Sequence, residues 1–146
     1  DKAMKILKPL KEVNCEIRGD EFIQSLDKDF KKANEEDWSL EYLDKIISVK
    51  IVSGVEEAIK HINGYSSGHT ESIITNNEET FKKFYEKIDS AIILKNASTQ
   101  FADGGEFGFG AEVGISTNNL PPRGPVGLGQ LVSYKYEIYG TGQIRK

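Results

Sequence analysis

The sequence predicts an α/β fold in which βαβ units build a largely parallel sheet. Three short runs of apolar and β-branched residues carry this prediction, at positions 46–52, 72–75 and 91–94. The segments between these runs are helical in pattern, and strands that alternate with helices through tight connections form parallel sheets. A glycine-rich stretch follows the third run, and long loops beyond a buried strand are common sites of function in α/β proteins.

The N-terminal quarter of the chain is predicted to hold two short helices and one strand. Residues 2–11 have a helical pattern, residues 13–17 alternate as a strand does, and residues 20–26 are again helical in pattern. Residues 27–38 are highly charged and poor in apolar side chains, so we expect an exposed connection there.

The middle of the chain begins with the run at 46–52, whose β-branched and mostly apolar residues are typical of a buried strand. Ser53 and Glu56 have the spacing of a capping box, which predicts a helix from Val55 to Ile62. The glycines between residues 64 and 68 are expected to end this helix.

A second strand is expected at 72–75, and Asn76 or Asn77 is expected to cap the helix that follows it. Apolar residues of this helix share one face at helical spacing: Phe81, Phe84, Tyr85 and Ile88. The run at 91–94 is the third strand.

The pattern changes after residue 95, because eight of the 14 glycines lie between Gly104 and Gly129. Residues 131–139 then alternate imperfectly between apolar and polar side chains, which predicts a late strand. A terminal strand rich in tyrosine commonly pairs with another element or another subunit.

Composition limits the classes of function. The 146 residues carry a net charge of -4, with 38% hydrophobic and 29% charged residues, which indicates one globular, soluble domain without a nucleic-acid partner. The longest apolar runs are about five residues, far short of the ~20 that span a bilayer, so no membrane segment is expected. One cysteine fits a reducing compartment such as the cytoplasm. The start is charged, has no apolar segment typical of a signal peptide and does not begin with methionine, which suggests a fragment.

Residues 64–68 match the G-x-S-x-G nucleophile elbow around Ser66. That motif requires a strand before the serine and a helix after it, whereas this sequence predicts the reverse order. No histidine follows His69 to complete a serine, aspartate and histidine triad. A turn that ends a helix is therefore favoured over a hydrolase.

The two histidines and the one cysteine do not have the spacing of a metal site, so no metal is expected. His61 is expected to be a packing or surface residue of a helix, whereas His69 either lines a cleft or bonds the backbone of a turn. Cys15 lies between Glu12 and Glu16, and neighbouring carboxylates raise the pKa of a thiol, which disfavours a nucleophile.

Polar residues beyond the third strand are candidates for ligand binding. Ser98 and Thr99 offer hydroxyl groups just past the strand end. Arg123 is the single basic residue between Lys95 and Lys135. It either pairs with Glu112 or Asp103 or binds a carboxylate or phosphate. The glycines at 104–110 match neither the G-x-G-x-x-G motif of dinucleotide-binding proteins nor the P-loop. They are expected to let the backbone pass close to a ligand or a neighbouring loop.

Nearly the whole chain, from about residue 10 to residue 146, resembles the C-terminal third of the γ-glutamyl phosphate reductases, members of the aldehyde dehydrogenase superfamily. The matching blocks include WSLEYLD at 38–44, EAIKHIN at 57–63, SGHTE at 67–71, NAST at 96–99, FADG at 101–104, FGFGAEVGIST at 107–117 and RGP at 123–125. The resemblance implies that residues 1–130 are the C-terminal part of an aldehyde-dehydrogenase-like catalytic domain. It also implies that residues 131–146 are a terminal strand for homo-oligomerisation.

The resemblance implies a reaction and its ligands. The family reduces γ-glutamyl phosphate with NADPH to glutamate-5-semialdehyde and phosphate in proline biosynthesis, through a cysteine thioester that hydride then reduces. The nucleophilic cysteine and the cofactor domain are expected upstream of the matched region, so that no catalytic residue lies in this chain and the fragment is inactive and binds NADPH poorly by itself. The same motifs occur in bifunctional pyrroline-carboxylate synthases.

Several site residues follow from the resemblance alone. Glu41, with Leu43, matches the element that contacts the nicotinamide ribose. Ser98, Thr99 and Phe101 match the loop that approaches the acyl substrate, and Arg123 is expected to contact the substrate anion.

Two departures from the family pattern are Gln100, where an arginine is usual, and the pair Pro121–Pro122 before Arg123. A competing interpretation is a non-catalytic module that keeps this fold for oligomerisation or ligand binding.

Overall fold

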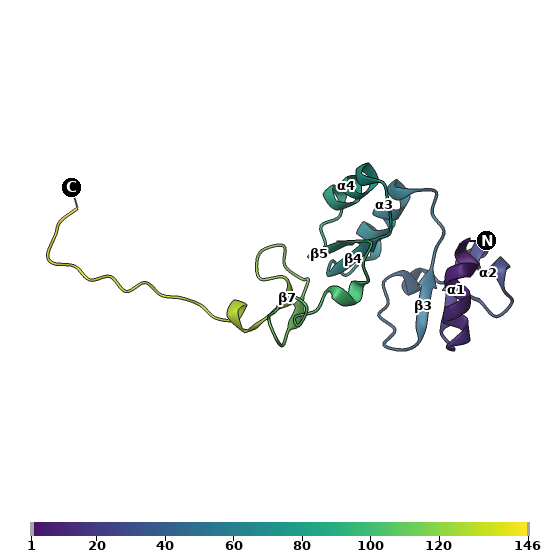
Figure 1. Cartoon of the computed structure of the whole chain (residues 1–146), viewed down its shortest axis with the longest axis horizontal. Coiled ribbons are helices and arrows are strands. Elements are labelled where there is room, and N and C mark those ends of the chain that lie inside the picture. The colour runs from purple at the N-terminus through teal and green to yellow at the C-terminus, as the bar shows by residue number, and fades with distance from the viewer. Residues whose placement is uncertain (1, 146) are drawn as a thin grey trace.

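The computed structural model describes residues 2–145. Figure 1 shows an elongated arrangement along the chain: an N-terminal unit, a second helix-covered unit, a small strand ribbon and an extended C-terminal segment. The described strands fall into two parallel sheets and one antiparallel pair. The predicted α/β class with parallel strands is confirmed, although the parallel strands form two sheets rather than one.

The N-terminal unit contains helices α1 (Lys2–Glu12) and α2 (Glu21–Leu26), a three-stranded sheet and the 3₁₀ helix Glu35–Trp38. The strands β1 (Glu16–Gly19), β2 (Lys31–Lys32) and β3 (Ile46–Val49) pair in parallel, in the order β2-β1-β3. Leu7, Ile17, Ile23 and Phe30 form its buried core.

Close packing of β1 against α2 depends on Gly19. A Cβ atom at this position would lie 2.2 Å from Cγ2 of Ile23, which is fully buried. Asp20 caps α2 by accepting a hydrogen bond from the Ile23 amide at 3.0 Å, and its other carboxylate oxygen accepts one from the Ile51 amide at 2.8 Å. Asp20 therefore joins the start of α2 to the chain just after β3.

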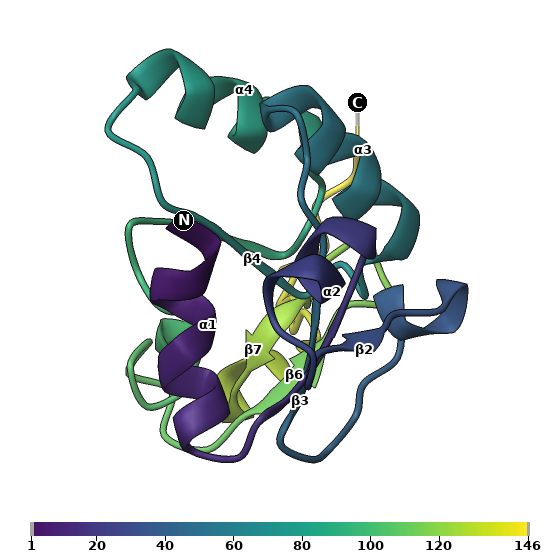
Figure 2. The ribbon, with the colours of Figure 1, turned by 90° about the vertical axis from the view of Figure 1, so that its right-hand side faces the viewer.

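The second unit is a β-strand pair with two helices. Helices α3 (Val55–Tyr65) and α4 (Glu78–Lys87) pack against one another, as Figure 2 shows, and strands β4 (Thr70–Ile73) and β5 (Ile92–Lys95) pair in parallel. Ile59, Phe84 and Ile88 form the core. Asn77 caps α4 by accepting from the Thr80 amide at 2.9 Å, as predicted.

The rest of the described chain is irregular apart from short elements. The 3₁₀ helix Thr99–Phe101 follows β5, strands β6 (Val113–Ile115) and β7 (Gly124–Val126) form an antiparallel ribbon, and the 3₁₀ helix Leu128–Gln130 follows β7. Within residues 2–145 no helix is long and apolar enough to cross a bilayer.

Four sequence predictions need correction. The first concerns residues 27–38, which are not a simple exposed connection. Phe30, Ala33 and Asp37 are buried there, and β2 pairs with β1. The Asp37 carboxylate is buried because it forms an ion pair with Arg18. The high charge of this segment in the sequence does not reveal that pairing.

The second correction concerns strand positions. The first strand begins at Glu16 rather than Val13, because Asn14 adopts a left-handed conformation (φ 59°) and the Cys15 amide still bonds back to Leu10 of α1. β4 begins two residues earlier than predicted and β5 one residue later, since their register pairs Thr70 with Ile92. β3 ends at Val49 and is only half-buried along most of its length.

The third correction concerns α3. Gly54, not Ser53, occupies the N-cap position, and Ser53 bonds Glu57 rather than Glu56. The predicted capping box is therefore not formed: Glu57 accepts bonds from the amide and hydroxyl of Ser53, and no side chain caps the helix at Gly54. The helix also continues through Gly64 and ends at Tyr65.

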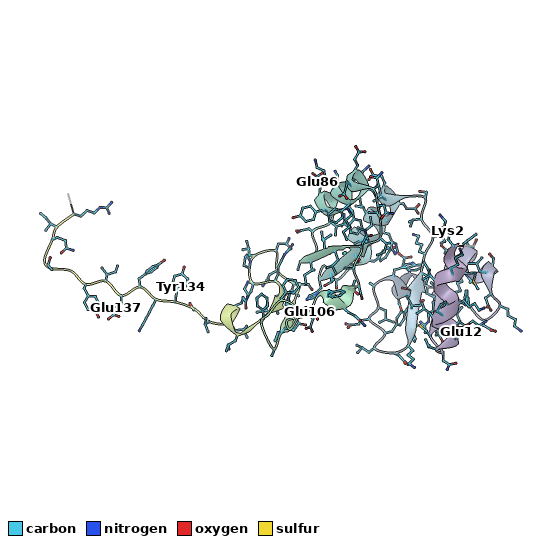
Figure 3. The ribbon with its side chains drawn as sticks, viewed as in Figure 1. Lys2, Glu12, Glu86, Glu106, Tyr134 and Glu137 are labelled. Atoms are coloured by element: carbon cyan, nitrogen blue, oxygen red, sulfur yellow. The ribbon has the colours of Figure 1, made fainter. Side chains whose placement is uncertain are left out.

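The fourth correction concerns residues 131–139, which form no strand with any described part of this chain. The segment extends away from the rest of the molecule, and the side chains of Tyr134 and Glu137 project from it (Figure 3). A strand needs a partner edge, and the chain by itself does not provide one. Pairing with another subunit stays a prediction.

Candidate functional site

Three segments that are distant in sequence meet around a cleft of about 630 Å³. The first is the end of the 3₁₀ helix of the N-terminal unit with the turn after it. The second is the end of α3 and the entrance to β4, and the third is β6 with the residue that follows it. This hollow, the Glu41 cleft, is lined by Trp38, Ser39, Leu40, Glu41, Tyr65, Ser66, Ser67, His69, Gly114 and Ser116. The cleft therefore combines aromatic rings, several hydroxyl groups and one carboxylate.

Asp37 positions the first segment of this cleft. Its carboxylate accepts hydrogen bonds from the Asn34 amide at 2.6 Å, from Arg18 at 2.7 Å and from the Tyr42 hydroxyl at 2.8 Å. These bonds, with the Asn34 amide contributing most, hold the pKa of Asp37 below its usual value. Burial and the bond to Asp37 raise the pKa of Tyr42. The residues on both sides of Glu41 are thus fixed by one ionic cluster.

The side chain of Glu41 is exposed in the cleft, and no hydrogen bond or ion pair engages it among the described residues. A carboxylate with two free oxygens can accept hydrogen bonds from two adjacent hydroxyl groups. Leu43 is 89% exposed, adopts a left-handed conformation (φ 53°) and does not line the cleft. The structure thus places Glu41, but not Leu43, in a concave site.

The end of α3 supplies the second wall. The Tyr65 hydroxyl donates to Glu35, which raises the pKa of Tyr65. Ser66 is the C-cap residue of α3, and its hydroxyl donates to Glu71 while it accepts from the Gly68 amide at 2.8 Å. Ser66 therefore ends a helix, as predicted, and within the described part of the chain no hydrogen bond joins its hydroxyl to a histidine.

His69 lines the same cleft, which was one of the two alternatives left open by its sequence context. His61 lies behind the cleft, in ring contact with Trp38 and Tyr65 at centroid distances of 5.3 and 4.7 Å. Burial lowers the pKa of His61, with a smaller effect from Lys50. His61 is thus a packing residue, as predicted.

The loop after β5 lies apart from the Glu41 cleft. Ser98 caps the 3₁₀ helix Thr99–Phe101 by accepting from the Gln100 amide at 3.2 Å. All three predicted substrate residues of this loop are exposed: Ser98, Thr99 and Phe101. Ser72 of β4 donates to the Ala97 carbonyl at 2.6 Å and so ties the loop to the parallel pair.

Arg123 is held by the chain that enters β5. Its guanidinium donates to the Asp89 carboxylate at 3.1 Å and to the backbone carbonyls of Asp89 and Ser90, both at 3.2 Å. The expected pairing with Glu112 or Asp103 is wrong, because the start of β7 lies beside the α4–β5 connection. Arg123 also lines a separate hollow of about 520 Å³, which contains none of the other predicted site residues.

Sequence reasoning missed several residues of the cleft, in particular Trp38, Tyr65 and Ser116. The sequence offered one signal for Trp38 and Tyr65, since each is a large aromatic residue beside a short polar run. No spacing rule connects them with β6, since the contact arises from folding of three separate segments. Cys15 is half-buried just before β1 and lines no part of the cleft. Residues 2–145 contain no group of three or more potential metal-ligating side chains.

Comparison with known proteins finds relatives that match nearly the whole chain. The chain is 60% identical to the gamma-glutamyl phosphate reductase of Bartonella tribocorum over 144 residues, which cover 99% of this chain and 35% of the relative. It is 56% identical to the enzyme of that name from Clostridium botulinum over 141 residues, or 97% of the chain and 34% of the relative. Over nearly its whole length the chain is therefore similar to gamma-glutamyl phosphate reductases, of which it spans about a third.

The structural comparison agrees. The crystal structure of gamma-glutamyl phosphate reductase from Thermotoga maritima matches with a TM-score of 0.85 and 49% sequence identity, over 97% of this chain and 34% of that chain. The resemblance inferred from the sequence motifs is thereby confirmed, as is the aldehyde-dehydrogenase-like α/β fold. The chain spans about a third of the length of these reductases, and no protein-family model matches it.

Proposed function

We propose that this chain forms part of an NADPH-dependent reductase that converts γ-glutamyl phosphate to glutamate-5-semialdehyde and phosphate, a step of proline biosynthesis in the cytoplasm. The observation that carries the proposal is the match of nearly the whole chain to reductases of this name, at 52–60% identity. The carboxylate of Glu41 supports the proposal as well, because it is exposed in the cleft and is free to accept hydrogen bonds from a ligand.

The side chains that line the cleft suit the ribose of a nicotinamide cofactor. Glu41 would accept hydrogen bonds from the ribose hydroxyls, and the rings of Trp38 and Tyr65 give the cleft apolar walls. NADPH supplies hydride to the acyl carbon when it is bound. Leu43, which is exposed and does not line the cleft, is proposed as a second contact of the cofactor.

The substrate is proposed to approach the loop after β5. Ser98, Thr99 and Phe101 are exposed there and offer two hydroxyl groups and one apolar ring. Arg123 is proposed as a further contact for the substrate anion, although its fork already engages Asp89 and Ser90.

Cys15 does not serve as the nucleophile in this proposal, because it lines no part of the cleft and its thiol contacts the Glu16 carbonyl at 3.8 Å. A cysteine outside the 146 residues would form the thioester. The isolated chain is therefore expected to be inactive and to bind NADPH weakly. Residues 131–146 are proposed to mediate homo-oligomerisation.

The test is phosphate-dependent reduction of NADP⁺ by glutamate-5-semialdehyde, with the full-length gene product and the 146-residue chain side by side. Activity of the full-length protein and none of the chain supports the proposal. Inactivity of both proteins favours the second candidate, a non-catalytic oligomerisation or ligand-binding module on the same fold.

A further inference from the structure

One histidine that lines the Glu41 cleft has a ring nitrogen without a hydrogen-bond partner among the described residues. Nε2 of His69 is buried and has no hydrogen-bond partner among the described residues. Unpaired buried nitrogen atoms are uncommon in native proteins and call for an explanation. His69 lines the cleft that also contains Glu41, so a ligand is a natural source of the missing partner.

The strand entrance fixes the imidazole ring. Nδ1 lies 2.7 Å from Oγ1 of Thr70, the first residue of β4, and the carbonyl of His69 accepts from the Ile92 amide at 2.9 Å. In the tautomer whose Nδ1–H donates to Thr70, Nε2 carries a lone pair and is a hydrogen-bond acceptor. The ring is thus held with an acceptor directed away from Thr70.

Gly114 covers this acceptor. A Cβ atom at Gly114 would lie 3.0 Å from Nε2, so the backbone of β6 packs directly against the ring. β6 and β7 form a ribbon of two short strands, and a two-stranded ribbon is only marginally stable by itself. A small outward movement of β6 would open Nε2 to the cleft.

The other cleft residues determine which ligand groups fit. The lining includes the Glu41 carboxylate and four serine hydroxyls but no lysine or arginine. The carboxylate accepts hydrogen bonds and repels anions, and the serine hydroxyls accept as well as donate. The lining therefore suits a donor group such as a hydroxyl, an amide N–H or an ammonium.

We infer that His69 is a ligand-binding residue, whose Nε2 accepts a hydrogen bond from a donor group of the ligand in the Glu41 cleft once β6 moves aside. The inference rests on the proposed reductase function for the identity of that ligand. The donor is then either a hydroxyl or carboxamide group of the cofactor or the α-ammonium group of the substrate.

The experiment uses the full-length gene product in the reverse reaction, with His69→Leu and His69→Gln. Loss of a neutral hydrogen bond corresponds to roughly a tenfold change, so His69→Leu should raise one KM about tenfold. A raised KM for NADP⁺ identifies the cofactor as donor, and a raised KM for the semialdehyde identifies the substrate. His69→Gln keeps an acceptor oxygen and should recover most of the loss. Both KM values within twofold of wild type in His69→Leu would overturn the inference.

A matched control is His61→Gln, since His61 also has a buried ring nitrogen without a partner but does not line the Glu41 cleft. This variant should change thermal stability and leave both KM values unchanged.

Nuclear magnetic resonance separates failure of the inference from failure of the proposed function. The imidazole ¹⁵N signals of wild-type protein, assigned by comparison with His69→Gln, are followed while NADPH and glutamate-5-semialdehyde are added separately. A shift of the His69 Nε2 signal on addition of either probe supports the inference even if the protein has no reductase activity. No shift with either probe overturns it, whether or not activity is present.

Discussion

Arg18 Nη1 lies 2.7 Å from Oδ1 of Asp37, and this ion pair connects the central strand of the N-terminal sheet with the turn that carries Glu41. Asp37 is 4% exposed, whereas its partner is more accessible. The same Arg18 side chain also bonds Glu16 at 2.7 Å and lies 5.0 Å from the Tyr42 ring centroid. One arginine therefore links β1 to both flanks of the candidate cofactor contact.

The first prediction concerns the pH dependence of this cluster. The pKa of Asp37 is lowered on folding, so its contribution to stability is present above its unfolded pKa of about 3.9 and is lost as the pH falls through the lower folded value. Asp37→Asn should lower the Tm at pH 7 and flatten the decline of Tm between about pH 5 and pH 2. Thermal melts across this range, recorded by circular dichroism, measure both effects.

Glu57 provides the comparison for Asp37, because its pKa is also lowered, by the amide and hydroxyl of Ser53. Glu57→Gln removes a titrating carboxylate from α3 without touching the Arg18 cluster. An identical Tm profile for both variants would show that the Arg18 contact has no special effect on stability.

The second prediction concerns the core of the α3–α4 unit. Phe84 is 2% exposed and packs with Ile59 and Ile88. Phe84→Ala should reduce the free energy of unfolding by about 3–5 kcal/mol, measured by urea denaturation. Tyr85→Ala on the same helix is the control, since Tyr85 is 61% exposed and should cost far less. Equal losses for the two variants would contradict the observed packing.

Sequence patterns predicted the elements whose residues alternate or repeat locally. The helix face with Phe84 and Ile88 is an example, because helical spacing alone brings those side chains to one core. Tyr85 belongs to the same sequence pattern but stays exposed, since no element covers that edge of α4 in the described chain. Periodicity therefore identifies a face but not the part of it that is covered.

The candidate site was less predictable. Family resemblance gave Glu41, but the contacts that shape the cleft join residues from three segments, and no local signal specifies such contacts. Arg123 illustrates the same limit. Its isolation in the sequence suggested a nearby carboxylate, yet its partner is Asp89, 34 positions away. Only the approach of β7 to the α4–β5 connection creates that pair.

The third prediction concerns Glu41. In the full-length protein, Glu41→Ala should raise the KM for NADP⁺ or lower kcat, because the ribose loses an acceptor, and should leave the Tm unchanged because the side chain is exposed and makes no bond. Steady-state kinetics of the reverse reaction measure this. Glu79→Ala is a suitable control, since Glu79 is an exposed carboxylate on α4 that lies outside the cleft. Cofactor kinetics equal to wild type would refute the ribose contact.

The fourth prediction separates two roles of Arg123. The guanidinium fork is occupied by Asp89 and Ser90, so Arg123→Lys should lower the Tm, because one ammonium cannot reproduce three directed bonds. If the fork only anchors β7, the KM for the semialdehyde stays unchanged. A raised substrate KM with normal stability would instead support a direct contact with the substrate anion. Asp89→Asn tests the anchor from its other side and should lower the Tm, because the guanidinium loses its charged acceptor.

The fifth prediction concerns the C-terminal segment, whose apolar side chains have no cover in the isolated chain. Tyr134, Tyr136 and Ile138 are 81–88% exposed and occupy alternate positions, so they would share one face of an extended strand. Pairing with a second copy would cover this face and satisfy the backbone.

Deletion of residues 131–146 should therefore reduce the mass in sedimentation velocity from an oligomer to a monomer. Tyr134→Asp with Tyr136→Asp should have the same effect, because two charges on the buried face oppose association, whereas Ser133→Asp with Glu137→Lys on the opposite face should leave the oligomer intact. A monomeric intact protein, or an unchanged mass after the deletion, would rule out this segment as the interface.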